Sequence, residues 1–481
     1  MLNFYQAIND KLKNSNSKCY VYYDETHYYP EMYENIEKFN SILKDYSANK
    51  IVFFTGKSFY AYCGIFSILL SGNVWVPVNP ELPEKRIIEM IQLANPSVIL
   101  IDRDIPSKIK SFIEERAIRI VNVNNIIKSN SKSSVSLNHI KKNDTAYIMF
   151  TSGSTGIPKG VPMTHKNFIN FIENAINILP FKTQEVFSDF HDLGFDISIF
   201  YLFCCVLTES AFAPFMKREE LFFPIDHIIQ NKITVWSSVP SAISRIMTMR
   251  PDENIHNSIR IMFLCGEPFR LDVLKYCYNN LKVKNIYNFY GLTETGVENF
   301  YHYCSINDLI RFKKKGFVPI GKPLPGNNIK ISSNKELLLS GCQITPGYIG
   351  NIAQDRFELI DNTRWFHTGD IIEKFEDVYF CKGRLDTQVK LSGYRVELMD
   401  VETHLRNIEG ISDSVCFVNN STLHCAVETS GSIDEKKIVY LLKKELPSYM
   451  IPKKYFYLKC FPKNKNGKID RNFITKQFLK T

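Results

Sequence analysis

Short apolar runs alternate with amphipathic stretches in the first part of the chain. The runs at 51–54, 74–78 and 97–101 have the length and composition of buried strands. The stretches between them show helical patterns. An alternation of strand, helix and strand predicts α/β layers around buried parallel strands. The same interpretation applies to further stretches: a strand at 146–150, a helix near 165–178, and strands at 233–236, 260–264 and 285–289.

The sequence pattern changes near residue 317, where short predicted strands alternate with glycine turns. Residues 126–143 are rich in Ser, Asn and Lys and are predicted to form a polar loop. Residues 385–481 are predicted to form a small α+β module. Its expected elements are helices at 398–408 and 434–445 and strands near 414–418 and 423–428. The fold class is therefore α/β with a smaller α+β unit at the C-terminal end.

Composition excludes several classes of protein. The chain has 481 residues, 44% of them apolar and 23% charged, which is typical of a globular protein and rules out disorder as the main state. The net charge of +9 is spread along the chain, so no nucleic acid partner is expected. The twelve cysteines form no CxxC pair, which favours reduced thiols in a cytoplasmic protein. No signal peptide opens the chain, and the apolar region 60–78 is interrupted by polar residues, so membrane insertion is not expected.

Residues 151–160, TSGSTGIPKG, follow directly on a predicted strand. Glycines, hydroxyl groups and a lysine in one turn can wrap a polyphosphate through backbone N–H groups, hydroxyls and charge. A Walker A loop is the alternative, because GKS occurs at 56–58. That motif requires a glycine where this chain has Ile51, so we reject it. The 151–160 run is therefore a phosphate loop of another kind.

This loop resembles the phosphate loop of the AMP-forming adenylating enzymes, which include acyl-CoA synthetases, peptide-synthetase adenylation domains and luciferases. Four further segments resemble motifs of that superfamily and occur in the expected order. They are NFYGLTET at 288–295, HTGD at 367–370, GRLDTQVKLSGYRVE at 383–397 and NGKID at 466–470. The resemblance covers nearly the whole chain. It implies a large N-terminal domain of layered α/β subdomains over residues 1–384, and a small mobile C-terminal domain over 385–481 that rotates about a hinge at Asp386.

The resemblance also implies ATP and Mg²⁺ as cofactors. Attack of a carboxylate on a phosphate brings like charges together, so cations must offset the negative charge. Glu294 is expected to hold Mg²⁺, Thr293 to contact phosphate oxygens and Lys468 to reach the forming acyl phosphate. These three are the expected catalytic residues. The expected ATP-binding residues are Thr151, Ser152, Gly153, Ser154, Thr155, Gly156, Lys159, Gly266, Glu267, Asn288, Tyr290 as an aromatic face for adenine, Gly291, Thr293, Asp370 for the ribose, Arg384 and Lys468.

The segment GFDISIF at 194–200 resembles the motif of the members that activate amino acids, in which the aspartate binds the substrate's α-ammonium. Asp196 would form that ion pair. Segments such as CGEP at 265–268 look most like D-alanine:carrier-protein ligases. Three phenylalanines in the mapped pocket imply a small side chain. The expected substrate-binding residues are Asp196, Ile197, Phe200, Ser237, Phe263, Cys265, Phe289, Val297 and Glu298.

Two departures from the family pattern leave the substrate open. Leu292 stands where proline is usual, and Glu298 places a carboxylate where the family tends to be neutral. If Glu298 faces the pocket, Ser, Gly or a small amine-bearing substrate competes with alanine. We expect an aminoacyl-AMP to form and then to pass to the phosphopantetheine thiol of a separate carrier protein, with the enzyme a monomer. An acyl- or aryl-CoA synthetase is the alternative, as is adenylation of another amino acid.

Overall fold

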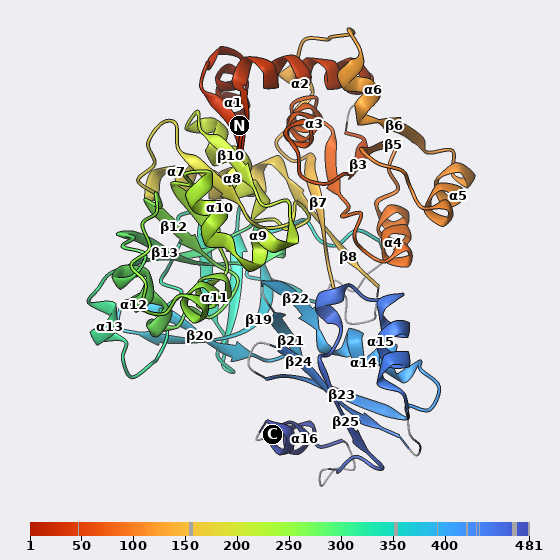
Figure 1. Ribbon diagram of the computed structural model, residues 1–481, viewed down its shortest axis with the longest axis vertical. Coiled ribbons are helices and arrows are strands. Elements are labelled where there is room, and N and C mark those ends of the chain that lie inside the picture. The colour runs from red at the N-terminus through yellow and green to blue at the C-terminus, as the bar shows by residue number, and fades with distance from the viewer. Residues whose placement is uncertain are drawn as a thin grey trace.

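The computed structural model describes residues 1–46, 48–152, 157–350, 355–391, 393–419, 422–429, 431, 433–463 and 469–479. Gly153, Ser154, Thr155, Gly156 and Lys468 lie outside these ranges. The described chain is a mixed α/β structure with several sheets and with helices between them (Figure 1). The predicted fold class is confirmed.

A six-stranded sheet carries the first layer, in the order β6-β5-β3-β4-β7-β8. All its neighbouring strands are parallel except the edge pair β7 and β8. The predicted strands at 51–54, 74–78, 97–101 and 146–150 are confirmed as β3, β4, β5 and β7. The bounds are β3 (Lys50–Phe54), β4 (Val74–Pro77), β5 (Val98–Ile101), β6 (Arg119–Asn122), β7 (Thr145–Thr151), β8 (Lys159–Thr164), α3 (Phe59–Leu70), α4 (Glu84–Ala94), α5 (Ser107–Glu115) and α6 (Val123–Lys128). Helix α6 extends into the predicted polar loop, which otherwise holds only the short 3₁₀ turn η1 (Leu137–His139).

A nine-stranded sheet forms the second layer, in the order β15-β14-β13-β12-β11-β9-β10-β1-β2. Its central strands are parallel and its ends antiparallel. The predicted strands at 233–236, 260–264 and 285–289 are confirmed as β11 to β13. The strand bounds are β1 (Lys18–Tyr22), β2 (Glu25–Tyr28), β9 (Val186–Asp189), β10 (Ala211–Pro214), β11 (Val235–Ser238), β12 (Ile261–Leu264), β13 (Asn285–Tyr290), β14 (Phe300–Cys304) and β15 (Lys322–Pro323).

The largest core of the molecule lies where helices separate these two sheets. Helices α3 and α8 are buried along almost their whole length, which explains why their sequences are apolar on every side. The helices of this part are α1 (Leu2–Asn14), α2 (Tyr29–Leu43), α7 (His165–Ile178), α8 (Ser198–Leu207), α9 (Arg218–Phe222), α10 (Pro224–Gln230), α11 (Pro240–Met249), α12 (Leu271–Asn279) and α13 (Asp308–Arg311), with the 3₁₀ turn η2 (Thr293–Thr295).

A five-stranded antiparallel sheet follows, with β16, β17, β19 and β18 in order and β20 on β19. It confirms the predicted change to short strands and glycine turns. The bounds are β16 (Asn327–Ile331), β17 (Glu336–Gly341), β18 (Phe357–Ile360), β19 (Thr363–Phe375) and β20 (Val378–Arg384). The last residue of this sheet, Arg384, directly precedes the C-terminal module.

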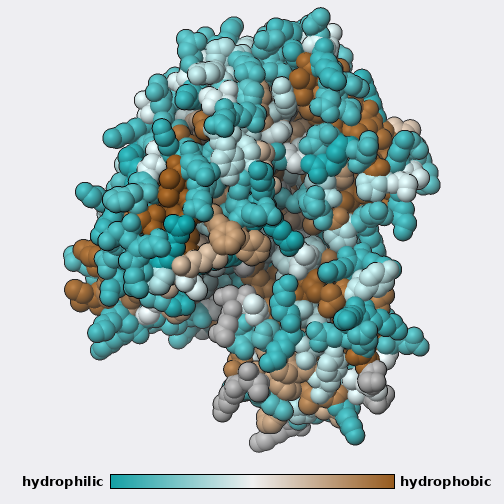
Figure 2. Space-filling model, viewed as in Figure 1, coloured by the Kyte–Doolittle hydropathy of each residue, from teal (hydrophilic) through white to brown (hydrophobic). Residues whose placement is uncertain are grey.

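The C-terminal module has a core of its own, built from α14, α15 and a three-stranded sheet. It is drawn in blue at the lower end of the molecule, and the surface narrows above it (Figures 1 and 2). The predicted helices and strands are confirmed: α14 (Leu398–Arg406), β23 (Asp413–Asn419), β24 (Thr422–Glu428) and α15 (Glu435–Lys443). The remaining elements are the hairpin β21 (Gln388–Leu391) and β22 (Tyr394–Glu397), the 3₁₀ turn η3 (Ser448–Met450), β25 (Lys454–Leu458) and α16 (Arg471–Phe478). The domain boundary at 384 stays a prediction.

Candidate active site

A cavity of about 300 Å³ opens where both large sheets meet the C-terminal module. The loops after the carboxyl ends of β7, β9, β11, β12 and β13 line one side, as is usual for ligand sites of parallel sheets. The β21–β22 hairpin and residues 447–449 line the other side. The predicted site residues on its wall are Thr151, Ser152, Asp196, Ile197, Cys265, Gly266, Gly291, Thr293, Val297, Glu298 and Arg384.

Other predicted site residues lie near the cavity without lining it. Among the described residues these are Lys159, Phe200, Ser237, Phe263, Glu267, Asn288, Phe289, Tyr290, Glu294, Asp370 and the hinge residue Asp386. Gly153, Ser154, Thr155, Gly156 and Lys468 lie outside the described part of the chain. The structure thus brings together residues from five separate sequence motifs around one cavity.

The predicted phosphate loop leaves the sheet at Thr151 and returns to it at Lys159, which pairs with Thr151 across the β7–β8 edge. The helix predicted near 165–178 is confirmed as α7, but the strand β8 between this loop and α7 was not predicted. Ser152 Oγ donates a hydrogen bond of 2.9 Å to the carbonyl oxygen of Arg395 in the hairpin. The Lys159 ammonium lies 5.6 Å from the centre of the Tyr348 ring. One end of the loop therefore contacts the C-terminal module.

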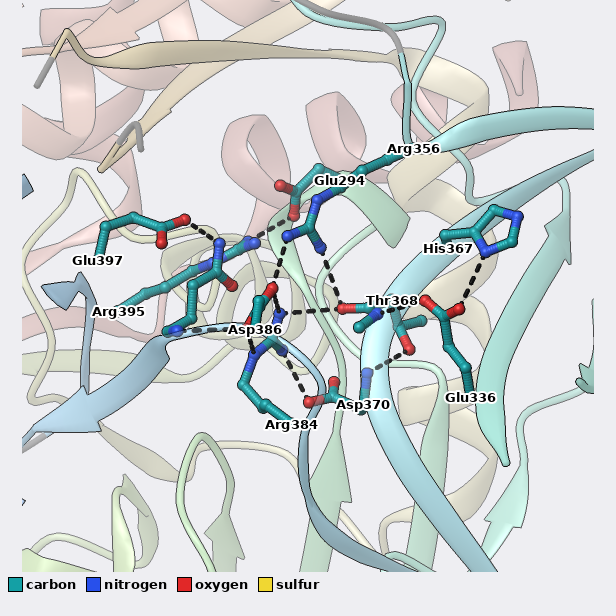
Figure 3. Close-up of polar contacts among 12 residues, drawn as sticks. Glu294, Glu336, Arg356, His367, Thr368, Asp370, Arg384, Asp386, Arg395 and Glu397 are labelled. Carbon is teal, nitrogen blue, oxygen red and sulfur yellow. Dashed lines mark hydrogen bonds and ion pairs between the residues drawn. The ribbon is translucent and has the colours of Figure 1, made fainter. Parts of the chain in front are cut away.

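Glu294 is a buried carboxylate in the turn η2 that follows β13, with 1% of its surface exposed. Arg395 Nη1 lies 2.7 Å from its Oε2, and the Tyr348 hydroxyl donates to its Oε1 at 2.9 Å. Burial alone would raise the pKa of Glu294, but the Arg395 charge and hydrogen bond outweigh it and lower that pKa below its ordinary value. Glu294 is therefore ionised, and both its oxygens have protein partners, of which Figure 3 shows Arg395.

The turn after Glu294 is strained and tightly held. Val297 has φ = 73°, a left-handed conformation that is rare for a β-branched residue. A Cβ on Gly291 would lie 2.1 Å from the carbonyl oxygen of Val297, so only glycine allows this approach. Gln343 Nε2 donates to the carbonyl oxygens of Gly296 and Glu298, each at 2.8 Å. These contacts fix the backbone that carries the Glu298 side chain.

The predicted hinge is an ion cluster (Figure 3). Arg384 lies 2.7 Å from Asp370 on one side and 2.7 Å from Asp386 on the other. Arg356 lies 2.6 Å from Asp386. Burial would raise the pKa of Asp386, but Arg384 and Arg356 hold it well below its usual range. The Tyr290 hydroxyl donates to Asp370 at 2.5 Å, and Tyr290 packs in the core rather than on the cavity wall.

Asp196 and Glu298 are the two carboxylates of the predicted substrate pocket. Asp196 Oδ2 and Glu298 Oε2 are buried, and neither has a hydrogen-bond partner in the described part of the chain. Burial raises the pKa of Asp196 to about 6, although a hydrogen bond with Thr293 opposes the shift. Burial also raises the pKa of Glu298 to about 8, against the opposing charge of Lys390. Glu298 lines the cavity, a point that the sequence had left open.

The three predicted pocket phenylalanines form a stack beside this region. Phe200 and Phe263 have ring centres 4.2 Å apart, and Phe263 and Phe289 4.1 Å. None of the three lines the cavity, and Ser237 is buried next to them in the sheet. Asn288 is also buried, and its Nδ2 donates to the carbonyl oxygen of Pro319 at 2.8 Å. The aromatic stack belongs to the same buried core as Cys265 and Val297, which line the cavity.

Several residues of the site were missed by sequence reasoning. Lys390 and Arg395 reach the cavity from the hairpin, Gly393 donates its N–H to Glu267 at 2.7 Å, and Tyr394 stacks on Tyr449 at 3.8 Å. Their signal was present, because all but Tyr449 lie in the quoted 383–397 motif. The docking of this hairpin could not be deduced, because it depends on how the C-terminal module sits against the rest.

Comparison with known proteins identifies the class. The family model described as AMP-binding enzyme matches residues 10–349, most of the chain. The chain therefore belongs to the AMP-binding enzyme family and is an adenylating ligase. Among curated relatives, the D-alanine--D-alanyl carrier protein ligase of Staphylococcus epidermidis is 28% identical over 462 residues, 93% of each chain.

Two solved structures share the fold. The Vibrio cholerae adenylation domain AlmE, solved with glycyl-adenosine-5'-phosphate, matches with a TM-score of 0.84 and 21% identity over 100% of this chain and 98% of its own. NpsA-ThdA from Klebsiella oxytoca, an artificially fused adenylation–PCP di-domain, matches with a TM-score of 0.81 and 19% identity over 94% and 93%. In the described ranges, no helix is both long and apolar enough to cross a membrane.

Proposed function

We propose that this ligase activates a small α-amino acid with ATP, forming an aminoacyl-AMP and pyrophosphate. It then transfers the aminoacyl group to the phosphopantetheine thiol of a separate carrier protein. The curated relatives named D-alanine--D-alanyl carrier protein ligase support this reaction pair. D-Alanine, the substrate in that name, and glycine, which the AlmE title names, are the first amino acids to test.

The observation that carries the proposal is the unpaired oxygen of Asp196 on the cavity wall. A buried carboxylate without a partner is costly, and an ammonium group is the partner that removes this cost. Asp196 lies in the same cavity as Thr151, Ser152 and Gly291 of the predicted nucleotide motifs. A carboxylic acid without an amine would leave Asp196 Oδ2 unpaired. An α-amino acid therefore fits this site better than a fatty or aryl acid.

The ATP end of the site is assigned by motif. Thr151 and Thr293 line the cavity and can donate hydroxyl hydrogen bonds to phosphate oxygens. The donor set fits Mg²⁺, because Glu294 is a buried and ionised carboxylate and oxygen is the ligand that Mg²⁺ prefers. When bound, Mg²⁺ would offset charge on the phosphates. Glu294 would hold it once Arg395 withdraws, and Lys468 would add a second positive charge.

The arrangement of the C-terminal module suits the transfer step. The β21–β22 hairpin contacts the cavity, with Arg395 on Glu294 and Gly393 on Glu267. Helix α16 lies at the far end of the module (Figure 1). Lys468 directly precedes Ile469, which lies two residues before α16. We propose that rotation about Asp386 exchanges the hairpin for the Lys468 segment, so that one cavity serves adenylation and then transfer.

The test is ATP–pyrophosphate exchange with a panel of small D- and L-amino acids. We expect exchange with at least one of them, and a rise in KM on the order of 10²-fold or more in Asp196→Asn, as for the loss of one partner of a buried ion pair. Asp308→Asn is the control, because Asp308 is a buried aspartate that does not line the cavity. Exchange only with fatty or aryl acids, or an unchanged KM in Asp196→Asn, would reject the proposal.

A further inference from the structure

The Glu298 side chain is a second carboxylate in the proposed amino-acid pocket. It is 4% exposed, lines the cavity, and its Oε2 has no hydrogen-bond partner among the described residues. The strained turn at Val297 and the two hydrogen bonds from Gln343 hold its backbone in place. A strained backbone persists only when its surroundings enforce it, so the position of Glu298 is a built feature of the cavity.

The groups that face Glu298 come from several elements. Asp196 precedes α8, Cys265 follows β12, and Lys390 belongs to β21 of the C-terminal hairpin. Burial is the main reason that the pKa of Glu298 is raised; Lys390 lowers it, Asp196 raises it and a hydrogen bond with Cys265 lowers it. The carboxyl groups of Asp196 and Glu298 therefore share this cavity, and Lys390, one of the cations that line it, belongs to the module that is proposed to rotate.

We propose that Glu298 binds an amino group on the side chain of the substrate, so that the preferred substrate is a short diamino acid. This inference rests on the proposed function, in which Asp196 binds the α-ammonium. Each unpaired carboxylate oxygen then receives one ammonium group of the same molecule. An alanine methyl group beside Glu298 would leave its Oε2 buried without a partner. A site built for a polar group discriminates strongly against an analogue that lacks it.

The side chain of this diamino acid must be short. The stacked Phe200, Phe263 and Phe289 rings fill the core beside the pocket, and the whole cavity of about 300 Å³ must also hold the nucleotide. A side chain with one methylene before the amine, as in 2,3-diaminopropionate, fits this limit. Its matched analogues are 2-aminobutyrate, which has a methyl in place of the amine, and serine, which has a hydroxyl.

The first experiment compares these three amino acids, in both enantiomers, by ATP–pyrophosphate exchange with the full-length wild-type chain. We expect kcat/KM for the better enantiomer of 2,3-diaminopropionate to exceed that for 2-aminobutyrate by at least tenfold. Equal values, or a preference for 2-aminobutyrate or alanine, would overturn the inference. In that case the proposed function still stands. If no amino acid supports exchange, the proposed function itself fails.

The second experiment removes the charge of Glu298. In Glu298→Gln we expect the ratio of kcat/KM for 2,3-diaminopropionate to kcat/KM for 2-aminobutyrate to fall at least tenfold. Glu220→Gln is the control, because Glu220 is 5% exposed and does not line the cavity. It should keep the wild-type preference. An equal loss for every amino acid in Glu298→Gln would overturn the inference.

A second variant keeps the carboxylate, so that the inference can still be tested if Glu298→Gln does not fold. Glu298→Asp withdraws the carboxylate by one methylene, so the preference should move toward 2,4-diaminobutyrate, whose side chain is one methylene longer. If Glu298 serves only to pair with Lys390, Glu298→Gln will slow carrier loading and leave the exchange preferences unchanged. That outcome, or an unchanged length preference in Glu298→Asp, would also overturn the inference.

Discussion

Single carboxylates decide the chemistry of this cavity at the scale of residues. Glu294 is ionised because Arg395 lies 2.7 Å away, whereas Glu298 is buried with one unpaired oxygen. The two glutamates lie four positions apart in one turn, and burial acts on both. The Arg395 charge lowers the pKa of Glu294, whereas burial dominates at Glu298 and raises its pKa. Sequence reasoning found both residues but could not predict this difference.

Replacing Glu298 should change stability with a defined pH dependence. Burial raises the pKa of Glu298 from its ordinary value of 4.5 to about 8. The folded protein therefore holds this proton more tightly than the unfolded chain does. The resulting stability is complete below about pH 4.5 and is lost as pH rises toward 8. Since glutamine has no such loss, Glu298→Gln should raise Tm relative to wild type at pH 8, by more than at pH 5.

Thermal unfolding of both proteins at pH 5, 6.5 and 8 measures this difference. Glu220→Gln is the control, because burial would raise the pKa of Glu220 but hydrogen bonds from Lys217, Tyr22 and Met216 lower it. The stability from a lowered carboxyl pKa is present above pH 4.5 and is lost only below it. The Tm difference between Glu220→Gln and wild type should therefore stay constant from pH 5 to 8. A Tm difference for Glu298→Gln that does not grow with pH would contradict the expectation.

Much of the candidate site could be predicted at this scale, because its residue types follow from the chemistry. A phosphate loop requires glycines and hydroxyls, and an α-ammonium requires a carboxylate; Thr151, Ser152 and Asp196, predicted on these grounds, line the cavity, and their binding roles stay predictions. Tyr290 was expected to offer its ring to adenine, and the structure places it in the core with its hydroxyl on Asp370. An aromatic residue serves a core and a ligand face equally well, and the sequence alone does not separate these uses.

At the scale of elements, the turn of residues 291–298 holds the site together. Gly291→Ala should lower Tm by about 2 °C or more, because the added Cβ would meet the Val297 carbonyl oxygen at 2.1 Å. Gly431→Ala is the control, since nothing lies within 4 Å of its added Cβ. Differential scanning calorimetry compares the two. Equal Tm values for both variants would show that the turn relaxes without cost.

The β21–β22 hairpin offers a second prediction at this scale. Removing Arg395 leaves the buried Glu294 without its charged partner only while the hairpin is docked. Arg395→Ala should therefore slow aminoacyl transfer to the carrier on the order of tenfold or more, and leave pyrophosphate exchange within about threefold of wild type. Arg406→Ala is the control from the same module, because its pair with Asp413 is at the surface and worth little. A parallel loss of exchange and transfer in Arg395→Ala would contradict this role.

Helices and strands with a strong hydrophobic pattern were predicted from the sequence, and those with a weak pattern were not. Buried strands such as β3 and β5 are uniformly apolar, and α7 has a clear apolar face, so all three were found. Helices α1 and α2 and strand β8 were missed. Strand β8 carries Gly160 and Pro162, which favour a loop locally, and its pairing with β7 overrides that preference. Tertiary contact, rather than local sequence, forms that strand.

At the scale of the whole molecule, the account requires two positions of the C-terminal module. Lys468→Ala should reduce formation of aminoacyl-AMP on the order of 10²-fold or more, as for one preorganised charge contact. Transfer from supplied aminoacyl-AMP to the carrier should stay near the wild-type rate, because the docked hairpin, not Lys468, faces the cavity in that step. Rapid-quench measurement of each half-reaction separates the two. An equal loss in the rates of adenylate formation and of transfer would contradict the proposal that Lys468 acts only in adenylate formation.

The aminoacyl-AMP that we propose for this ligase can be identified directly as the product that stays bound to the protein. The full-length chain is incubated with ATP, Mg²⁺ and an equimolar mixture of small D- and L-amino acids, fatty acids and aryl acids, without any carrier protein. Mass spectrometry then identifies the adenylate that stays bound. The account predicts an aminoacyl-AMP in the wild-type protein and its loss in Asp196→Asn. A fatty-acyl or aryl adenylate as the bound product would contradict the account.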